Sequence, residues 1–219
     1  MDFLKKLILY FKKPKVIITA ADKKKSPAKI IFEILKPRFK TQKLYEKIPN
    51  VLNLLNSEIF IIETEFKNNQ FSKKIGIFLR NSQLPILVVS HIEIIEPEPE
   101  NFSIEDKKIE NIKKLVLGIP PYGSLILNVD EKIIREIDKI TNLKSFSFGF
   151  SERADFIASD INEDKENINF KLNYKGNSVP IWLNKVSNRE EIYDVLSAIC
   201  VGRLLGLNIV EMSNSIKNL

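Results

Sequence analysis

The sequence lacks the cysteines, the signal peptide and the long apolar runs that define several protein classes. A single cysteine, Cys200, in 219 residues excludes an internal disulfide and a thiolate metal cluster, and it indicates a reducing cytoplasm. Apolar runs such as Ser124 to Val129 are interrupted far short of the roughly 20 residues that a membrane-spanning helix needs. These absences predict a soluble cytoplasmic protein. One sizeable core is expected from 44% hydrophobic residues.

Positive charge is concentrated near the amino terminus. Residues 1–50 contain 14 lysines and arginines against 4 acidic residues, whereas the chain as a whole carries a net charge of +6. The first 14 residues predict a basic amphipathic helix, with Phe3, Leu4, Leu7, Ile8 and Phe11 on one face. Such a segment suits a partner protein or an anionic surface, although lysine-rich faces are more often only solvated surface. Nucleic acid is a less favoured partner.

β-branched apolar runs alternate with helical segments through residues 15–150. The expected strands are Lys15–Ala20, Glu58–Glu63, Pro85–Ser90, Ser124–Val129 and Lys144–Phe148. The expected helices are Ser26–Leu35, Phe71–Arg80, Ile104–Leu117 and Glu131–Ile140, and Ser-Pro at Ser26 is a helix-start signal. Strands that alternate with helices predict a parallel sheet.

The pattern changes after residue 150. Short alternating strands are expected at Phe156–Ile161, Ile168–Tyr174 and Val179–Leu183, with a hairpin turn at Lys175-Gly176-Asn177. Helices follow within 188–218, the first ending at Gly206. We therefore predict an α/β three-layer sandwich with a mostly parallel, P-loop-type sheet at 15–150 and a small antiparallel β annex at 151–185. The aromatic alternation of Phe170, Tyr174 and Trp182 favours core packing over a stacking platform.

The first strand-loop-helix unit is the natural anion site, because a helix amino terminus offers free N–H groups to a phosphate. Its loop, Ile18 to Ser26, is ITAADKKKS. This segment resembles the ITGTxGKT[TS] loop of the Mur ligase central domain, with Thr19, Lys24 and Ser26 at matching positions and with Ala20 and Lys23 where the family has glycines.

Three later segments carry the same resemblance in the same order. Leu117–Glu131 (LGIPPYGSLILNVDE) is similar to the family's LPxxGxxVLNADD, and Ile192–Gly206 (IYDVLSAICVGRLLG) is similar to its NALAAxAxGxxLG helix. Phe148–Ile161 and Phe170–Leu183 resemble the strands between them. The likeness is strongest to the ligase type that adds D-alanyl-D-alanine to the UDP-N-acetylmuramoyl tripeptide.

The resemblance implies a site for ATP and Mg²⁺. It places Lys23, Lys24, Lys25 and Ser26 around the phosphates, and Ser26 and Glu63 at the metal ion. Asp194, with Glu190 and Glu191, stands where the family has a His-Asn pair and a later asparagine around the adenine. No catalytic residue is assigned.

Other family residues have no matching position in this sequence. The histidine expected after the third strand is missing, and His91 is interpreted as a strand-end residue. Lys113 and Lys114 lie in the region where the family has a carbamylated lysine, but neither matches that position securely.

Two functions remain open from the sequence. The first is ATP-dependent acid–amino-acid ligation of the peptidoglycan, or cell-wall, pathway, in a chain whose phosphate loop is degenerate and whose flanking ligase domains are expected to be absent or supplied separately. The second is a non-catalytic binding module, a pseudoenzyme that uses its basic amino-terminal segment to bind a protein partner or an anionic surface.

Overall fold

The computed structural model describes residues 3–20, 26–65, 75–76, 78–90, 102–131, 134, 137, 139–184 and 188–217, with the side chains of 102–108 excepted. The first half contains α1 (Phe3–Lys12), β1 (Lys15–Ala20), α2 (Ala28–Leu35), β2 (Thr41–Tyr45), α3 (Val51–Asn56), β3 (Ile59–Thr64) and β4 (Leu84–Val89). The second half contains α5 (Phe102–Leu117), β5 (Ser124–Asn128), β6 (Lys144–Gly149), β7 (Phe156–Glu163), β8 (Asn167–Tyr174), β9 (Asn177–Asn184), α7 (Glu190–Leu204) and α8 (Ile209–Ile216).

The strands form one continuous sheet in the order β2-β3-β1-β4-β5-β6-β7-β8-β9. Strands β1 to β6 pair in parallel, β6 pairs in parallel with β7, and β7 to β9 pair antiparallel. The predicted parallel sheet and antiparallel annex are therefore confirmed, and the annex extends the same sheet. The predicted hairpin is also present, because Lys175 and Gly176 both have positive φ, as its two-residue turn requires.

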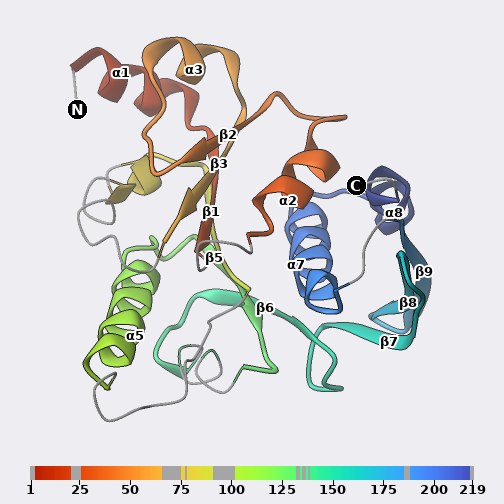
Figure 1. The fold of residues 1–219 in the computed structure, drawn as a ribbon. Helices are drawn as coiled ribbons and strands as arrows, with labels where there is room; N and C mark the ends of the chain where they lie inside the picture. The colour runs from red at the N-terminus through yellow and green to blue at the C-terminus, as the bar shows by residue number, and fades with distance from the viewer. Residues whose placement is uncertain are drawn as a thin grey trace.

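Two hydrophobic cores lie on opposite faces of this sheet. Successive residues of β1 alternate between them, since Ile17 belongs to the core beneath α2 and α7, whereas Val16 and Ile18 belong to the core beneath α5. Figure 1 shows α5 on one side of the parallel strands and α2 and α7 on the other. Because both faces are covered, the strands are nearly continuous apolar runs. The architecture is the predicted three-layer sandwich.

Two elements were missed by sequence reasoning, β2 and α3. Strand β2 is an edge strand of half-buried and exposed residues, and α3 is short and capped by Asn50, whose side chain accepts a hydrogen bond from the Asn53 N–H at 2.8 Å. The expected helices at 71–80 and 131–140 are helical at the positions that the structure describes between 75 and 80 and between 134 and 139. No described helix combines the length and the hydropathy needed to cross a bilayer.

The end of α7 agrees with the prediction from its glycine. The helix stops at Leu204, and Gly206 has a φ of 86°, the left-handed conformation that ends many helices. Cys200 is fully buried within α7, and burial, followed by the nearby charge of Asp155, raises the pKa of its thiol well above the ordinary value. A buried thiol of this kind packs as a small apolar side chain.

Candidate functional site

The carboxyl ends of the parallel strands meet at one edge of the sheet, which we call the carboxyl edge. The strand register sets Thr19 of β1 beside Glu63 of β3 and Val88 of β4, and it sets Asn128 of β5 beside Phe148 of β6. From β1 the chain passes to β2 and β3 on one side and then to β4 and β5 on the other. Ligands of open α/β sheets bind at such a switch in strand order, outside the strand carboxyl ends.

Ser26 lies where the loop after β1 enters α2. Its Oγ is 3.3 Å from the Oγ of Thr19, a fully buried residue, and it accepts a hydrogen bond from the Ala28 N–H at 3.3 Å. Pro27 already has helical backbone angles, so the predicted Ser-Pro start of the helix is confirmed to within a residue. These contacts place the Ser26 hydroxyl at the positive end of the helix dipole, where an anion is stabilised. The three predicted lysines, Lys23, Lys24 and Lys25, lie outside the described residues.

Glu63 stands on the neighbouring strand at the same level of the sheet. Its side chain is 20% exposed, and its Oε2 is 3.6 Å from the Nζ of Lys43 on β2. Hydroxyl and carboxylate oxygens are the donors that Mg²⁺ prefers, so Thr19, Ser26 and Glu63 fit the ion chemically. A cation arriving at Glu63 has to share this carboxylate with Lys43. The described residues contain no cluster of three acidic, histidine or cysteine side chains that would hold a metal by themselves.

Two further residues of the carboxyl edge, Ser90 and Asn128, were missed by sequence reasoning. Both are fully buried, and Asn128 donates from Nδ2 to the Ser90 carbonyl at 3.1 Å and accepts from the Asp130 N–H at 3.1 Å. The Ser90 hydroxyl has no hydrogen-bond partner among the residues described. A polar residue directly after a buried apolar run, as in PILVVS and SLILN, was the only sequence signal available.

Asp130 was also missed by sequence reasoning, and its carboxylate links three parts of the chain through hydrogen bonds. Its carboxylate accepts hydrogen bonds from the N–H groups of Phe150 and Ser151 at 2.6 and 3.1 Å and from the Tyr193 hydroxyl at 3.1 Å. Burial and then the negative charge of Asp130 raise the pKa of the Tyr193 phenol, which donates this hydrogen bond. Gly149 makes room, because a Cβ at this position would lie 2.6 Å from the carboxylate.

An aromatic and cationic cluster surrounds this anchor. The rings of Phe150 and Tyr193 are 4.5 Å apart, and the Arg189 guanidinium lies 5.0 Å from the centre of the Phe150 ring. Asp194, the predicted adenine-side residue, follows Tyr193 on α7 and is half-buried. Its role in nucleotide binding stays a prediction.

The remaining candidates do not join this edge within the described structure. Lys113 is exposed, and Lys114 pairs with Glu110 one turn away at 2.6 Å. His91 falls outside the described residues.

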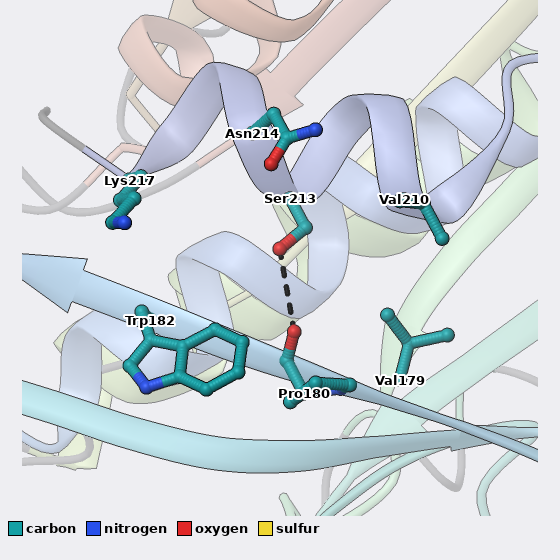
Figure 2. Close-up of a pocket in the computed structure, with 7 residues that line it drawn as sticks. All are labelled: Val179, Pro180, Trp182, Val210, Ser213, Asn214 and Lys217. Carbon is teal, nitrogen blue, oxygen red and sulfur yellow. Dashed lines mark hydrogen bonds between the residues drawn. The ribbon is translucent and has the colours of Figure 1, made fainter.

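Only some of the alternating aromatic side chains of the annex pack in the core. Phe170 is buried and Tyr174 stacks on Phe156 with ring centres 4.1 Å apart, as predicted, but Trp182 is 49% exposed, so core packing was wrong for it. The sheet register explains the difference, because Trp182 pairs with Asn169, whereas its neighbour Ile181 pairs with Phe170 on the buried side. Trp182 lines a cavity of about 220 Å³ between β9 and α8. Figure 2 shows it there with Val210 of α8, which also lines the cavity. This cavity belongs to the annex and not to the carboxyl edge.

Sequence comparison finds relatives among ligases named for UDP-N-acetylmuramate and UDP-N-acetylmuramoyl-peptide substrates. The chain is 31% identical over 149 residues to UDP-N-acetylmuramoyl-L-alanyl-D-glutamate–2,6-diaminopimelate ligase 2 of Clostridium acetobutylicum, which covers 67% of this chain and 27% of that protein. It is 24% identical over 176 residues to UDP-N-acetylmuramate–L-alanine ligase of a Hydrogenobaculum species, covering 78% of this chain and 37% of the relative. No protein-family model matches the chain.

Structure comparison finds the same fold in solved proteins. A crystal structure of MurF from Acinetobacter baumannii superposes with a TM-score of 0.76 at 17% identity, covering 98% of this chain and 49% of that one. MurF ligase from Thermotoga maritima, solved in complex with ADP, superposes with a TM-score of 0.68 at 15% identity, covering 97% and 52%. The chain thus spans 27% and 37% of these two curated relatives and about half of these solved chains. The sequence relatives are ligases of different types, so they indicate the family and not one type within it, and the structural neighbours show that the fold is shared.

Proposed function

We propose that this chain, a member of the Mur ligase family in sequence and fold, binds ATP with Mg²⁺ at the carboxyl edge. The observation that carries the proposal is the register that sets Glu63 beside Thr19, whose hydroxyl in turn contacts Ser26 at the start of α2. A carboxylate and two hydroxyls therefore lie around a helix amino terminus at the switch in strand order. The ADP complex of the structurally similar MurF supports a nucleotide as the ligand.

In this proposal each described group has a separate task. The Ser26 hydroxyl and the Glu63 carboxylate hold the magnesium ion, which neutralises phosphate charge when it is bound. The amino terminus of α2 orients the phosphates through its N–H groups. Lys24, as the family resemblance implies, adds a positive charge to the phosphates, and the three successive lysines, Lys23 to Lys25, partly replace the backbone contacts that glycines provide in the family loop.

The reaction class follows from the relatives' names. Those proteins are ligases of UDP-N-acetylmuramoyl substrates with amino acids, and we infer that this chain serves the same class of ATP-dependent acid–amino-acid ligation. Because the matched region is only part of each ligase, the acid and amine substrates would be bound by regions outside it. Nucleotide binding is thus the part of the activity that can be tested with this chain alone.

Calorimetric titration of the purified chain with ATP, with and without magnesium, tests the proposal. We expect saturable, magnesium-dependent binding that weakens about tenfold or more in Ser26→Ala, which removes a hydroxyl ligand of the ion, and in Glu63→Gln, which removes the negative charge of another ligand. Lys24→Ala should weaken binding with and without magnesium. Matched controls are Ser178→Ala and Glu166→Gln, which change exposed residues of the annex. Absence of binding at millimolar ATP, or equal binding by the site variants and the controls, would overturn the proposal.

A further inference from the structure

Helix α1 presents a large apolar face to solvent. Five side chains form this face, which we call the α1 face: Phe3, Leu4, Leu7, Tyr10 and Phe11. Phe3 and Phe11 are 80% and 76% exposed, while Leu9 on the opposite side of the helix is fully buried in the core. Because residues three and four apart share a helix face, Phe3, Leu7 and Phe11 form one stripe. The helix is held to the protein by one side and leaves its aromatic side uncovered.

The neighbouring helix α3 holds α1 in place and extends the exposed apolar surface. The Lys12 ammonium donates to the Leu55 carbonyl, and Leu54 is buried in the same core as Leu9. Leu52 and Leu55 of α3 are themselves exposed. Figure 1 shows the two helices side by side at one end of the molecule.

This end is the amino-terminal edge of the parallel sheet. Helix α1 leads into β1 and α3 leads into β3, so both helices lie at the starts of strands whose other ends form the carboxyl edge. A ligand at the carboxyl edge and a contact at the α1 face therefore occupy opposite ends of the sheet. Binding at one does not block the other.

The charge around the α1 face is mainly positive. Residues 3–20 contain five lysines and no acidic residue, and the sequence of α3 has no acidic residue either. Lys6, Lys12 and Lys13 are exposed. Acidic residues near these two helices are few, with Asp2 just before α1 and Glu58 just after α3. Exposed aromatic and leucine side chains on a helix with mostly lysines around them are typical of segments that lie in the plane of an anionic lipid surface.

We propose that the α1 face binds the surface of an anionic lipid bilayer, an inference that goes beyond nucleotide binding. The aromatic stripe enters the boundary between headgroups and acyl chains, and the lysines pair with lipid phosphates. At ten residues, α1 lies on the bilayer and does not cross it. Charge complementarity selects this occupant, because a second copy of the chain would bring the same lysines against themselves.

Sedimentation of the full chain with lipid vesicles tests the inference. Vesicles of equal parts phosphatidylglycerol and phosphatidylcholine should bind the chain, and vesicles of phosphatidylcholine alone should bind it at least about tenfold more weakly, since several lysines each contribute to binding at an anionic surface. The variant Phe3→Ser/Phe11→Ser should lose about tenfold or more of the binding to anionic vesicles. Leu117→Ser/Val210→Ser is the matched control, because both residues are exposed leucine or valine side chains on other helices.

Three results would overturn the inference. The chain fails to bind anionic vesicles, or the phenylalanine variant binds as well as the leucine–valine control, or the chain is a dimer by light scattering that the phenylalanine variant converts to a monomer. Circular dichroism confirms that each variant is folded, which we expect because the replaced side chains are exposed. ATP titration of the phenylalanine variant keeps the two proposals separate, since the loss of vesicle binding should leave nucleotide binding unchanged.

Discussion

The polar groups at the two edges of the parallel sheet differ in whether they have strong partners within the protein. At the amino-terminal edge the protein satisfies its own groups: the Ser82 hydroxyl donates to the Pro14 carbonyl at 2.9 Å, and the Lys40 N–H donates to the Glu58 carboxylate at 2.9 Å. At the carboxyl edge the buried Ser90 hydroxyl has no partner among the described residues, and Glu63 has a lysine at 3.6 Å. Polar groups left without strong internal partners are those available to a ligand.

The largest expected effect is a loss of stability when the buried Asn128 at the carboxyl edge is replaced. Asn128→Leu removes the partners of the Ser90 carbonyl and the Asp130 N–H together, and it should lower the free energy of unfolding by about 3 kcal/mol. Urea denaturation measures the change. Asn214→Leu, on the exposed side of α8, is the control and should have little effect. Equal stability of the two variants would show that this edge does not depend on the buried amide.

Gly149→Ala should have the next largest effect. The added Cβ would lie 2.6 Å from the Asp130 carboxylate, which has to move away from the Phe150 and Ser151 N–H groups, at a cost of about 2 kcal/mol. Thermal or urea unfolding measures it. At Gly76, an added Cβ would meet only the Arg80 side chain at an ordinary 3.8 Å, so Gly76→Ala should be neutral or slightly stabilising. A neutral Gly149→Ala would refute the role of close packing here.

A smaller effect is expected from removing the lysine that competes for Glu63. Lys43→Gln leaves the carboxylate without its positive neighbour, so magnesium-dependent ATP binding should strengthen by a few-fold, a charge effect at a partly exposed pair. Calorimetry at several magnesium concentrations measures this shift. Lys171→Gln, which breaks a pair with Asp160 in the annex, is the matched control. Weaker binding in Lys43→Gln would mean that Lys43 itself contacts the nucleotide.

The smallest expected effect is a change in the pKa of Tyr45, a residue of β2 beside the same edge. The hydrogen bond from the Tyr45 hydroxyl to Glu65, at 2.6 Å, together with partial burial and nearby carboxylates, raises the pKa of Tyr45 to about 12. Because the folded pKa lies above that of the unfolded chain, the stabilisation is complete below about pH 10 and is lost as pH rises through about 12. Ultraviolet titration of tyrosine ionisation in Glu65→Gln, compared with the unchanged chain, should show one phenol with a lower pKa. An unchanged titration curve would contradict the assignment.

Sequence reasoning predicted those candidate site residues that a local pattern or the family resemblance marks. Ser26 follows from a strand, a loop and a helix start in consecutive residues, whereas Glu63 lies at the end of another buried strand and its role is implied by the family resemblance. Asn128 and Tyr193 were missed because the partners of their hydrogen bonds lie 38 and 63 residues away in the chain, where no local pattern records them.

Contacts between residues far apart in the sequence also explain the errors in the predicted fold. Buried strands such as β1 are continuous apolar runs and were predicted, whereas β2 is an edge strand with the sequence TQKLY, without a buried residue to mark it. Trp182 alternates like a core residue, but the face of β9 that is covered depends on tertiary packing. Apolar periodicity predicted the elements with two covered faces, and the half-exposed elements depended on contacts that are distant in sequence.

Hydrogen exchange of backbone amides with and without ATP and magnesium tests most directly whether the carboxyl edge is the ligand site. We expect slower exchange at the start of α2 and around Asn128 to Asp130, with α1 and α3 unchanged. Protection confined to α1 and α3, or no protection at saturating nucleotide, would contradict the assignment of this edge.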